Sequence, residues 1–380
     1  MKWFKKIGLF VCVVPFVSCS EQKPLGTESY TVKVDFHEDE LQASSFLKDY
    51  QLIPLETPST ETVISHIDRL LFAEDRVFVL DGISNKVLAF DGNGKFVAST
   101  AKMIGKGHNE YIHVCDVAWD RDAQKLYMHC DAPFQMMVFD FDLNLEAIIP
   151  MDYYVREMVM EGDWVYGLRP NSRADSGNEL IAVRKDSLNQ PPRIVYANTD
   201  AIRGRLIMGR SLNACEDGVY VALPFENNIC KVRDGRVVCI YEMDFGDEGL
   251  REHPIDKNMS PNAFDNHYMD IHWGIVNMSG SDSLLLFNTN RPHQFILNQK
   301  TKECHAYNEI FHDKAPFSNQ YITPSQGLSK GVAYEIGTKS VGRTLKRVEE
   351  GEKVLDTAVV NKMRQIVPDG NPMIMVGFFE

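Results

Sequence analysis

One meander in the N-terminal third of the chain constrains the fold more than any other segment. Two apolar runs, Val77–Leu80 and Val87–Phe90, are followed by Phe96–Val97, which begins a third. The intervening Asp91-Gly92-Asn93-Gly94 is typical of a tight turn, because Gly and Asn adopt positive φ at low cost. Together with Ile67–Phe72 upstream, these runs predict a four-stranded antiparallel meander of about forty residues, which is the unit of a β-propeller.

The same pattern recurs along the chain. In each copy a Val/Leu/Tyr-rich strand follows a turn, a polar break comes next, and a further strand leads into a hairpin, often through Asp or Asn. Apolar and polar residues alternate only weakly along the inner strands, as is expected for sheets that are covered on both faces. The five legible copies span residues 67–99, 114–149, 157–196, 211–241 and 271–307.

A sixth copy has to use both ends of the chain. Asp49–Leu55, Gly331–Ile336 and Pro372–Phe379 are strand-like, whereas Asp356–Val367 has apolar residues at helical spacing. Pairing strands from the two ends removes the exposed edges of a linear stack. We therefore predict an all-β fold, a six-bladed β-propeller closed by strands from both termini, with one short C-terminal helix. Seven blades is the alternative if residues 244–266, interpreted as an insertion, contain strands.

The first residues have the pattern of an export signal. Lys2, Lys5 and Lys6 precede the apolar stretch Ile7–Val17, which is too short to span a bilayer. The small residue before Cys19 resembles a bacterial lipobox, which implies cleavage before Cys19 and acylation of its thiol. An ordinary secretory signal with a chance cysteine is the alternative. We expect a signal peptide over 1–18, an anchor site and tether over 19–45, and the propeller over 46–380.

Charge and cysteine spacing exclude some partners. A net charge of -13 argues against nucleic acid as a partner, since such proteins carry a basic face. Cys230 and Cys239 flank the turn Asp234-Gly235, and a two-residue turn there predicts a cross-strand disulfide. Cys115 and Cys130 are arranged similarly. The alternative is that these cysteines are small buried apolar residues.

Metal ligands are not recognisable in the sequence. No cysteine pair has the CxxC spacing of a zinc site. Six of the eleven histidines lie between residues 253 and 312, but no set of three ligands is identifiable among them. We therefore expect no metal and no cofactor.

Several motifs resemble a known family. Tyr50–Thr57 resembles its Ile-Pro-Leu-Glu-Thr signature, Ile67–Phe90 its first blade, Gly105–Tyr111 its glycine-rich loop, and Gly370–Pro372 its Asn-Pro ending. The family is the six-bladed β-propeller lipoproteins of the Bacteroidetes, which are distantly similar to NHL-repeat propellers. The resemblance covers roughly residues 45–380. It implies the fold and a lipid-anchored location in the cell envelope, at the outer membrane, and it carries no catalytic residues.

The loop Gly105–Tyr111 is conspicuous, but it lacks the strand–helix context of a phosphate-binding loop. His108-Asn109 replace the Pro-Gly of the family motif. We expect this loop to join the first two blades, with Glu110 and Tyr111 fixing it by hydrogen bonding and packing.

Candidate binding residues lie in the polar breaks between second and third strands, because loops at one end of a propeller are the usual binding surface. The candidates are Arg169, Arg173, Asn227, Arg291 and His293.

These observations predict an envelope-anchored propeller that binds or scaffolds a polar ligand, either a glycan or a peptide, or a partner protein. The alternative is a carbohydrate-active lyase or hydrolase with its site at the axial funnel. No Gly-x-Ser-x-Gly motif is present. An enzyme requires an acid or base beside a charge stabiliser at the axis, whereas a partner-binding platform requires an apolar patch on one face.

Overall fold

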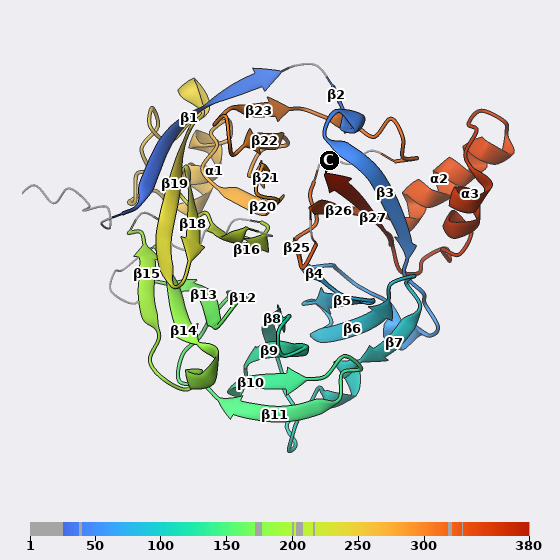
Figure 1. Ribbon diagram of the computed structural model, residues 1–380, viewed down its shortest axis with the longest axis horizontal. Coiled ribbons are helices and arrows are strands. Elements are labelled where there is room, and N and C mark those ends of the chain that lie inside the picture. Colours follow the sequence, from blue (N-terminus) through green and yellow to red (C-terminus); the bar gives the residue numbers. More distant parts are fainter. Residues whose placement is uncertain are drawn as a thin grey trace, which may run out of the picture.

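The computed structural model describes residues 26–37, 40–171, 177–199, 201–202, 208–215, 217–317, 321–328 and 330–379. Its sheets are arranged around a central point, with the innermost strand of each sheet facing that point (Figure 1). No helix in these ranges is both long and apolar enough to cross a membrane.

Five antiparallel units follow one another along the chain, as the repeats predict. Unit 1 contains β4 (Arg69–Ala73), β5 (Arg76–Asp81), β6 (Lys86–Asp91) and β7 (Phe96–Ser99). Unit 2 contains β8 (Val114–Asp120), β9 (Lys125–Asp131), β10 (Phe134–Phe139) and β11 (Leu145–Pro150). Unit 3 contains β12 (Glu157–Glu161), β13 (Trp164–Pro170), β14 (Asn178–Arg184) and β15 (Arg193–Ala197). Unit 4 contains β16 (Leu212–Cys215), β17 (Gly218–Val221), β18 (Asn228–Arg233) and β19 (Arg236–Asp244). Unit 5 contains β20 (Ile275–Gly280), β21 (Leu284–Thr289), β22 (Gln294–Asn298) and β23 (Cys304–Tyr307).

Aspartates at strand ends build the turns between the outer strands. The Asp91 carboxylate accepts hydrogen bonds from the backbone N–H groups of Asn93 and Lys95, both at 2.9 Å. Asp140 repeats this arrangement in unit 2, accepting from the N–H groups of Asp142 at 2.9 Å and Asn144 at 2.8 Å. These hydrogen bonds span only two to four residues, which explains why the turns can be predicted from the sequence.

Unit 6 combines strands from both ends of the chain. β27 (Met373–Phe379) lies between β26 (Gly331–Ile336) and β3 (Leu47–Pro54) and is antiparallel to both. The short β25 (Ser325–Gln326) pairs in parallel with β4 and connects this region to unit 1. Two further short strands, β2 (Leu41–Gln42) and β24 (Ile310–Phe311), pair with each other. The expected pairing of N-terminal and C-terminal strands is therefore present.

The N-terminal strand β1 (Glu28–His37) lies within the segment expected to be a tether. It pairs in parallel with β19 of unit 4 and with β23 of unit 5, so that it joins the two outer edges into one nine-stranded sheet (Figure 1). Its side chains alternate: Val32 and Val34 are buried, whereas Lys33 and Asp35 are exposed. Within the part of the chain that the structure describes, the first strand thus begins at Glu28, before the expected boundary at residue 46.

The helices differ from the expectation of one C-terminal helix. α3 (Thr357–Met363) coincides with the helical pattern and buries Val360 and Met363. A second C-terminal helix, α2 (Thr338–Glu349), was not predicted, because Val341 is its one fully buried residue and its other apolar residues, Leu345 and Val348, are half-buried. Both helices lie outside β3 and β27 in Figure 1.

The insertion after unit 4 contains a further helix, α1 (Pro261–His267). Residues 245–266 are all described and contain η5 (Gly246–Glu248) and the start of α1, but no strand. The alternative of an additional blade in this segment is therefore wrong. The remaining 3-10 turns are η1 (Ala43–Ser45), η2 (Thr60–Thr62), η3 (Thr100–Met103) and η4 (Lys185–Ser187).

The loop Gly105–Tyr111 joins units 1 and 2, as expected. The Glu110 carboxylate accepts a hydrogen bond from the Gly107 N–H at 2.6 Å. The Tyr111 ring is fully buried, and its hydroxyl lies 2.6 Å from Thr100 Oγ1 and donates to the Asn85 carbonyl at 3.0 Å. These contacts give the loop a structural role.

Candidate binding site at the axis

A cavity of about 980 Å³ opens at the centre of the ring, and every unit contributes to its lining. In units 1 to 5, part of the lining comes from residues that lead into the innermost strand: His66 and Asp68 before β4, His113 before β8, Arg156 before β12, Arg210 before β16, and Trp273 before β20. We call this space the axial cavity. Loops between second and third strands complete it, through Ile83 in unit 1 and Asn290 in unit 5. Convergence of several chain segments on one concave space is the usual form of a ligand site.

Two lining residues, Arg210 and Glu157, belong to a buried polar group that also includes Arg69 and Asp116; we call these four residues the inner charge cluster. Arg210 donates from both terminal nitrogens to Asp116, at 2.9 and 2.6 Å, and Arg69 donates to the same carboxylate at 3.1 Å. Burial and, next in size, the neighbouring Arg210 lower the pKa of Arg69 to about 9, so Arg69 remains cationic at neutral pH. The cluster ties units 1, 2, 3 and 4 together beneath the cavity.

Glu157 is held by the backbone rather than presented to a ligand. One of its carboxylate oxygens accepts from the N–H groups of Ser211 and Leu212, both at 2.9 Å. The other oxygen lies 3.3 Å from the guanidinium of Arg156, which is more exposed than Glu157. Arg156 is therefore the member of this pair that can reach a ligand in the cavity.

Further titratable groups line the walls. His66 Nε2 lies 4.0 Å from Asp68 Oδ1, and His113 Nδ1 lies 2.9 Å from Asp131 Oδ1. Burial raises the pKa of the Glu335 carboxyl, and the nearby His66 opposes this shift. The walls thus offer donors and acceptors of both charge signs, which suits a polar ligand better than a strongly charged one.

Exposed apolar side chains surround the polar walls. Ile83, Met208 and Tyr321 line the cavity and are 69%, 83% and 53% exposed. Large apolar side chains exposed together around one concave space mark an interaction surface more strongly than single ones do. We call these three residues the apolar rim.

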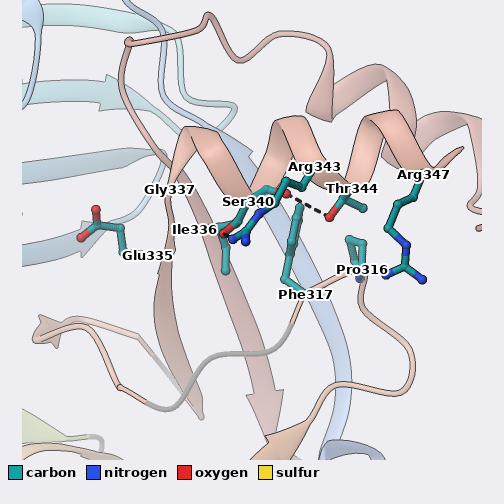
Figure 2. Close-up of a pocket in the computed structure, with 9 residues that line it drawn as sticks. All are labelled: Pro316, Phe317, Glu335, Ile336, Gly337, Ser340, Arg343, Thr344 and Arg347. Atoms are coloured by element: carbon teal, nitrogen blue, oxygen red, sulfur yellow. Dashed lines mark hydrogen bonds between the residues drawn. The ribbon is translucent and has the colours of Figure 1, made fainter. Parts of the chain in front are cut away.

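A second cavity, of about 430 Å³, lies between α2 and the loop at Pro316 and Phe317. Figure 2 shows Ser340, Arg343, Thr344 and Arg347 projecting from α2 on the side of that loop. Arg343 donates to the Ser340 hydroxyl at 3.2 Å, and Arg347 Nε lies 3.5 Å from the Glu352 carboxylate. This cavity is smaller and draws on one region of the fold, so we consider the axial cavity the better candidate.

Of the residues predicted from the sequence to bind a ligand, the four that the structure describes do not line the axial cavity. Arg169 Nε donates to the Glu179 carboxylate at 2.6 Å within unit 3. Asn227 donates to the His272 carbonyl at 2.7 Å and accepts from the Leu250 N–H at 2.8 Å, which anchors the insertion after unit 4.

Arg291 and His293 are brought together, but near the same insertion. Arg291 lies 3.3 Å from the Glu248 carboxylate, and the His293 ring lies 5.6 Å from the ring of His272. Burial lowers the pKa of His293. Arg173 and Cys19 lie outside the described residues.

The predicted disulfide between Cys230 and Cys239 is absent, and both residues are free thiols. A register shift between Lys231 and Val232 places Cys230 opposite Ile240, and Cys239 opposite Lys231. The two thiols therefore belong to different core clusters. A register shift next to Cys115 places Cys130 opposite Val114 rather than opposite Cys115. Cys115 and Cys130 are therefore also free thiols.

Two groups among the described residues have donor sets that could hold a metal ion, and neither was identified from the sequence. One is His113, Cys115 and Asp131 at the axial cavity, where the Cys115 sulfur lies 3.9 Å from His113 Nδ1. Burial raises the pKa of the Cys115 thiol, which disfavours the thiolate that a metal requires. The other is Asp35, His37 and His305, on β1 and β23.

Loops between second and third strands, where the sequence placed the candidate residues, contribute to the axial cavity in units 1 and 5, but most of its lining was not predicted. The missed residues share one signal: a titratable or aromatic side chain stands one to three positions before the innermost strand in units 1 to 5. Aligning the five repeats at the start of that strand would have revealed it.

The strand arrangement and the axial cavity define a protein of the β-propeller class. The chain matches, over residues 29–378, the family described as a domain of unknown function, DUF4934, and it belongs to that family. No curated protein matches it significantly.

Solved structures are similar in fold. A protein assigned as exported in Bacteroides fragilis NCTC 9343 is 12% identical, with a TM-score of 0.65 over 92% of this chain and 100% of that one. A gluconolactonase from Xanthomonas campestris is 10% identical, with a TM-score of 0.46 over 90% of this chain and 94% of that one. PorZ, a surface component of the type-IX secretion system of Porphyromonas gingivalis, is 12% identical, with a TM-score of 0.42 over 74% of this chain and 31% of that one.

Proposed function

We propose that this chain is a six-bladed propeller whose axial cavity binds a segment of a polar chain molecule, a glycan or a peptide. Units 1 to 5 and the mixed unit 6 supply six blades, and the pairing of β3 with β27 supports closure of the ring.

One observation carries the binding proposal: the axial cavity combines polar walls of both charge signs with the apolar rim. A glycan or peptide presents hydrogen-bonding groups beside apolar faces, so both parts of the cavity have a counterpart on the ligand. Arg156 offers a guanidinium, and Asn290 and Tyr321 come from the opposite side of the ring, which allows contacts along an extended chain.

The test is a binding screen of the full chain in mild detergent against defined glycans and peptides, followed by titration calorimetry of the best ligand. Tyr321→Ala and Arg156→Gln should each weaken binding by about tenfold or more, since Tyr and Arg are the residue types that most often contribute more than about 1 kcal/mol to an interface. Val354→Ala is a matched control, because Val354 is an exposed apolar residue that does not line the cavity. Binding that is unchanged in both cavity variants would exclude the axial cavity as the site.

The same proposal includes attachment to the cell envelope. The basic and apolar N-terminal segment, the small residue before Cys19, and the family resemblance support a lipoprotein of the outer membrane. The fold similarity to a protein assigned as exported in Bacteroides fragilis is consistent with this location. Replacement of Cys19 by Ser should abolish labelling with a radioactive fatty acid and release the chain from membranes. Retention of the label in the variant would contradict acylation at this residue.

A second candidate, cleavage of a carbohydrate at the same cavity, is favoured by Glu335. Its pKa is raised by burial, as a general acid requires, and it lines the axial cavity. Glu335→Gln should abolish turnover of any glycan that is bound but leave binding in place. A bound glycan that remains intact over prolonged incubation with the natural chain argues for binding alone.

A further inference from the structure

Three side chains from two distant parts of the sequence converge on the outer edge of unit 5. Asp35 pairs in register with His305 across the parallel strands β1 and β23, and His37 lies two positions further along β1, on the same face as Asp35. His37 Nε2 lies 3.0 Å from His305 Nδ1, and the Asp35 Oδ2 atom lies 3.3 Å from the former and 3.6 Å from the latter.

This spacing matches the ligand shell of a small divalent metal. Zinc bonds of about 2.0–2.1 Å to nitrogen and oxygen place ligand atoms about 3.3–3.4 Å apart at the corners of a tetrahedron. The three measured separations bracket this value. Two imidazoles and one carboxylate also form a ligand set that zinc commonly uses, with a fourth position left for water.

Hydrogen bonding alone satisfies this group poorly. A neutral imidazole carries one proton, which lies on either of its ring nitrogens. Two neutral imidazoles therefore bring at most two protons to the three contacts among His37, His305 and the ionised Asp35, and at least one contact remains without a hydrogen bond. A cation at the centre serves all three atoms at once.

The surroundings suit a site that is open to solvent yet held in place. The side chains of Asp35, His37 and His305 are 66%, 35% and 41% exposed, so a hydrated ion can reach them. The His37 ring stacks on the ring of Tyr307 with centroids 4.9 Å apart, which fixes its orientation. Packing that holds a ligating side chain in one orientation pre-organises a metal site.

We propose that Asp35, His37 and His305 bind one divalent cation of the zinc class, and that this ion fastens the N-terminal strand β1 to unit 5. The site is independent of the axial cavity. Because β1 is the described strand nearest to the expected lipid anchor, the ion would link the tethered end of the chain to the propeller.

The experiment measures metal binding by the full chain, purified in mild detergent with a tag that contains no histidine and stripped with a chelator. Zinc is titrated in competition with a chromogenic chelator. The natural chain should bind zinc at this site, and His37→Ala and His305→Ala should each weaken that binding by about 100-fold or more, because even outer-shell partners contribute about 10- to 100-fold. Zinc should also raise the midpoint of thermal unfolding of the natural chain but not of these variants.

His113→Ala is the matched control, because it removes the corresponding imidazole of the group at the axial cavity. This variant should retain the high-affinity zinc site. Equal zinc affinity in the natural chain and in the His37→Ala and His305→Ala variants would overturn the proposal, as would loss of the site in His113→Ala.

Cobalt gives a measurement that needs no variant. Bound Co²⁺ should show the visible absorption of a tetrahedral site without a thiolate charge-transfer band, because no cysteine belongs to this group. A strong thiolate band at one bound equivalent would instead place the ion at Cys115 and contradict the proposal.

Discussion

Arg210 and Asp116 form a two-point ion pair across the centre of the propeller, with nitrogen–oxygen distances of 2.9 and 2.6 Å. Asp116 belongs to the inner strand of unit 2, whereas Arg210 leads into the inner strand of unit 4. The same carboxylate accepts from Arg69 of unit 1 and from the backbone N–H of Met158 in unit 3. One carboxylate therefore connects four units beneath the axial cavity.

Replacing Asp116 by Asn should destabilise the fold strongly. The variant leaves the buried guanidinium groups of Arg69 and Arg210 with Glu157 as the one remaining carboxylate of the inner charge cluster, and breaking a buried ion pair costs about 3–5 kcal/mol. Urea unfolding followed by circular dichroism measures the change. Asp142→Asn is the control: the Asp142 side chain is 60% exposed, and its pair with Arg76 should contribute less than about 1 kcal/mol. Similar losses in the two variants would show that the cluster is not a central support.

Acid should destabilise the protein through His312. Its side chain is 3% exposed, its ring lies 5.0 Å from that of Tyr334, and burial lowers its pKa to about 4. The unfolded chain, with a pKa of about 6.5, takes up a proton that the folded chain does not. Stability is therefore complete above pH 6.5 and declines as the pH falls from 6.5 toward 4, by up to about 3 kcal/mol from this residue.

His312→Gln should reduce this decline, because Gln does not titrate. The free energy of unfolding, measured by urea titration at several pH values between 7 and 4, gives the slope. His108→Gln, at an exposed position, should leave the slope unchanged. An identical slope in the His312 variant and the natural chain would mean that burial of this imidazole does not control acid stability.

Gly94 makes a contact between unit 1 and unit 6 that no other residue can make. Its φ is +90°, and an added Cβ would lie 2.1 Å from the carbonyl oxygen of Pro54, at the end of β3. Gly94→Ala should therefore cost more than the 1–2 kcal/mol of a left-handed alanine. Gly162 also has a positive φ, of +52°, but has no atom within 4 Å of the added Cβ. Thermal unfolding of Gly94→Ala and Gly162→Ala separates the cost of a positive φ, which both variants have, from the clash with Pro54, which only Gly94→Ala has. Equal unfolding midpoints would mean that the clash with Pro54 does not constrain this position.

The units of the fold could be predicted because their signals are local. Turns such as Asp91–Gly94 form hydrogen bonds within a few residues, so their pattern is visible in the sequence. The helix α2 and the strand β1 have no such short-range signal. α2 buries one side chain, and β1 depends on partners more than two hundred residues away.

The candidate sites depend on long-range register and were mostly missed. A register shift at Lys231 separates Cys230 from Cys239, and no feature of the sequence predicts this shift. The pairing of β1 with β23 brings His37 next to His305, although the run of histidines before residue 312 gave no sign of a partner near residue 37. The lining of the axial cavity becomes apparent only when the units are placed around one centre.

The most direct test of the axial site compares ligand affinity by calorimetry in the natural chain and in three variants. Arg156→Gln changes the cavity wall, Met208→Ala changes the apolar rim, and Arg343→Gln changes the second cavity beside α2. We predict that a glycan or peptide found by screening binds at least about tenfold more weakly to the first two variants and with unchanged affinity to the third. Unchanged affinity in the first two variants, or weakened binding only in Arg343→Gln, would contradict binding at the axial cavity.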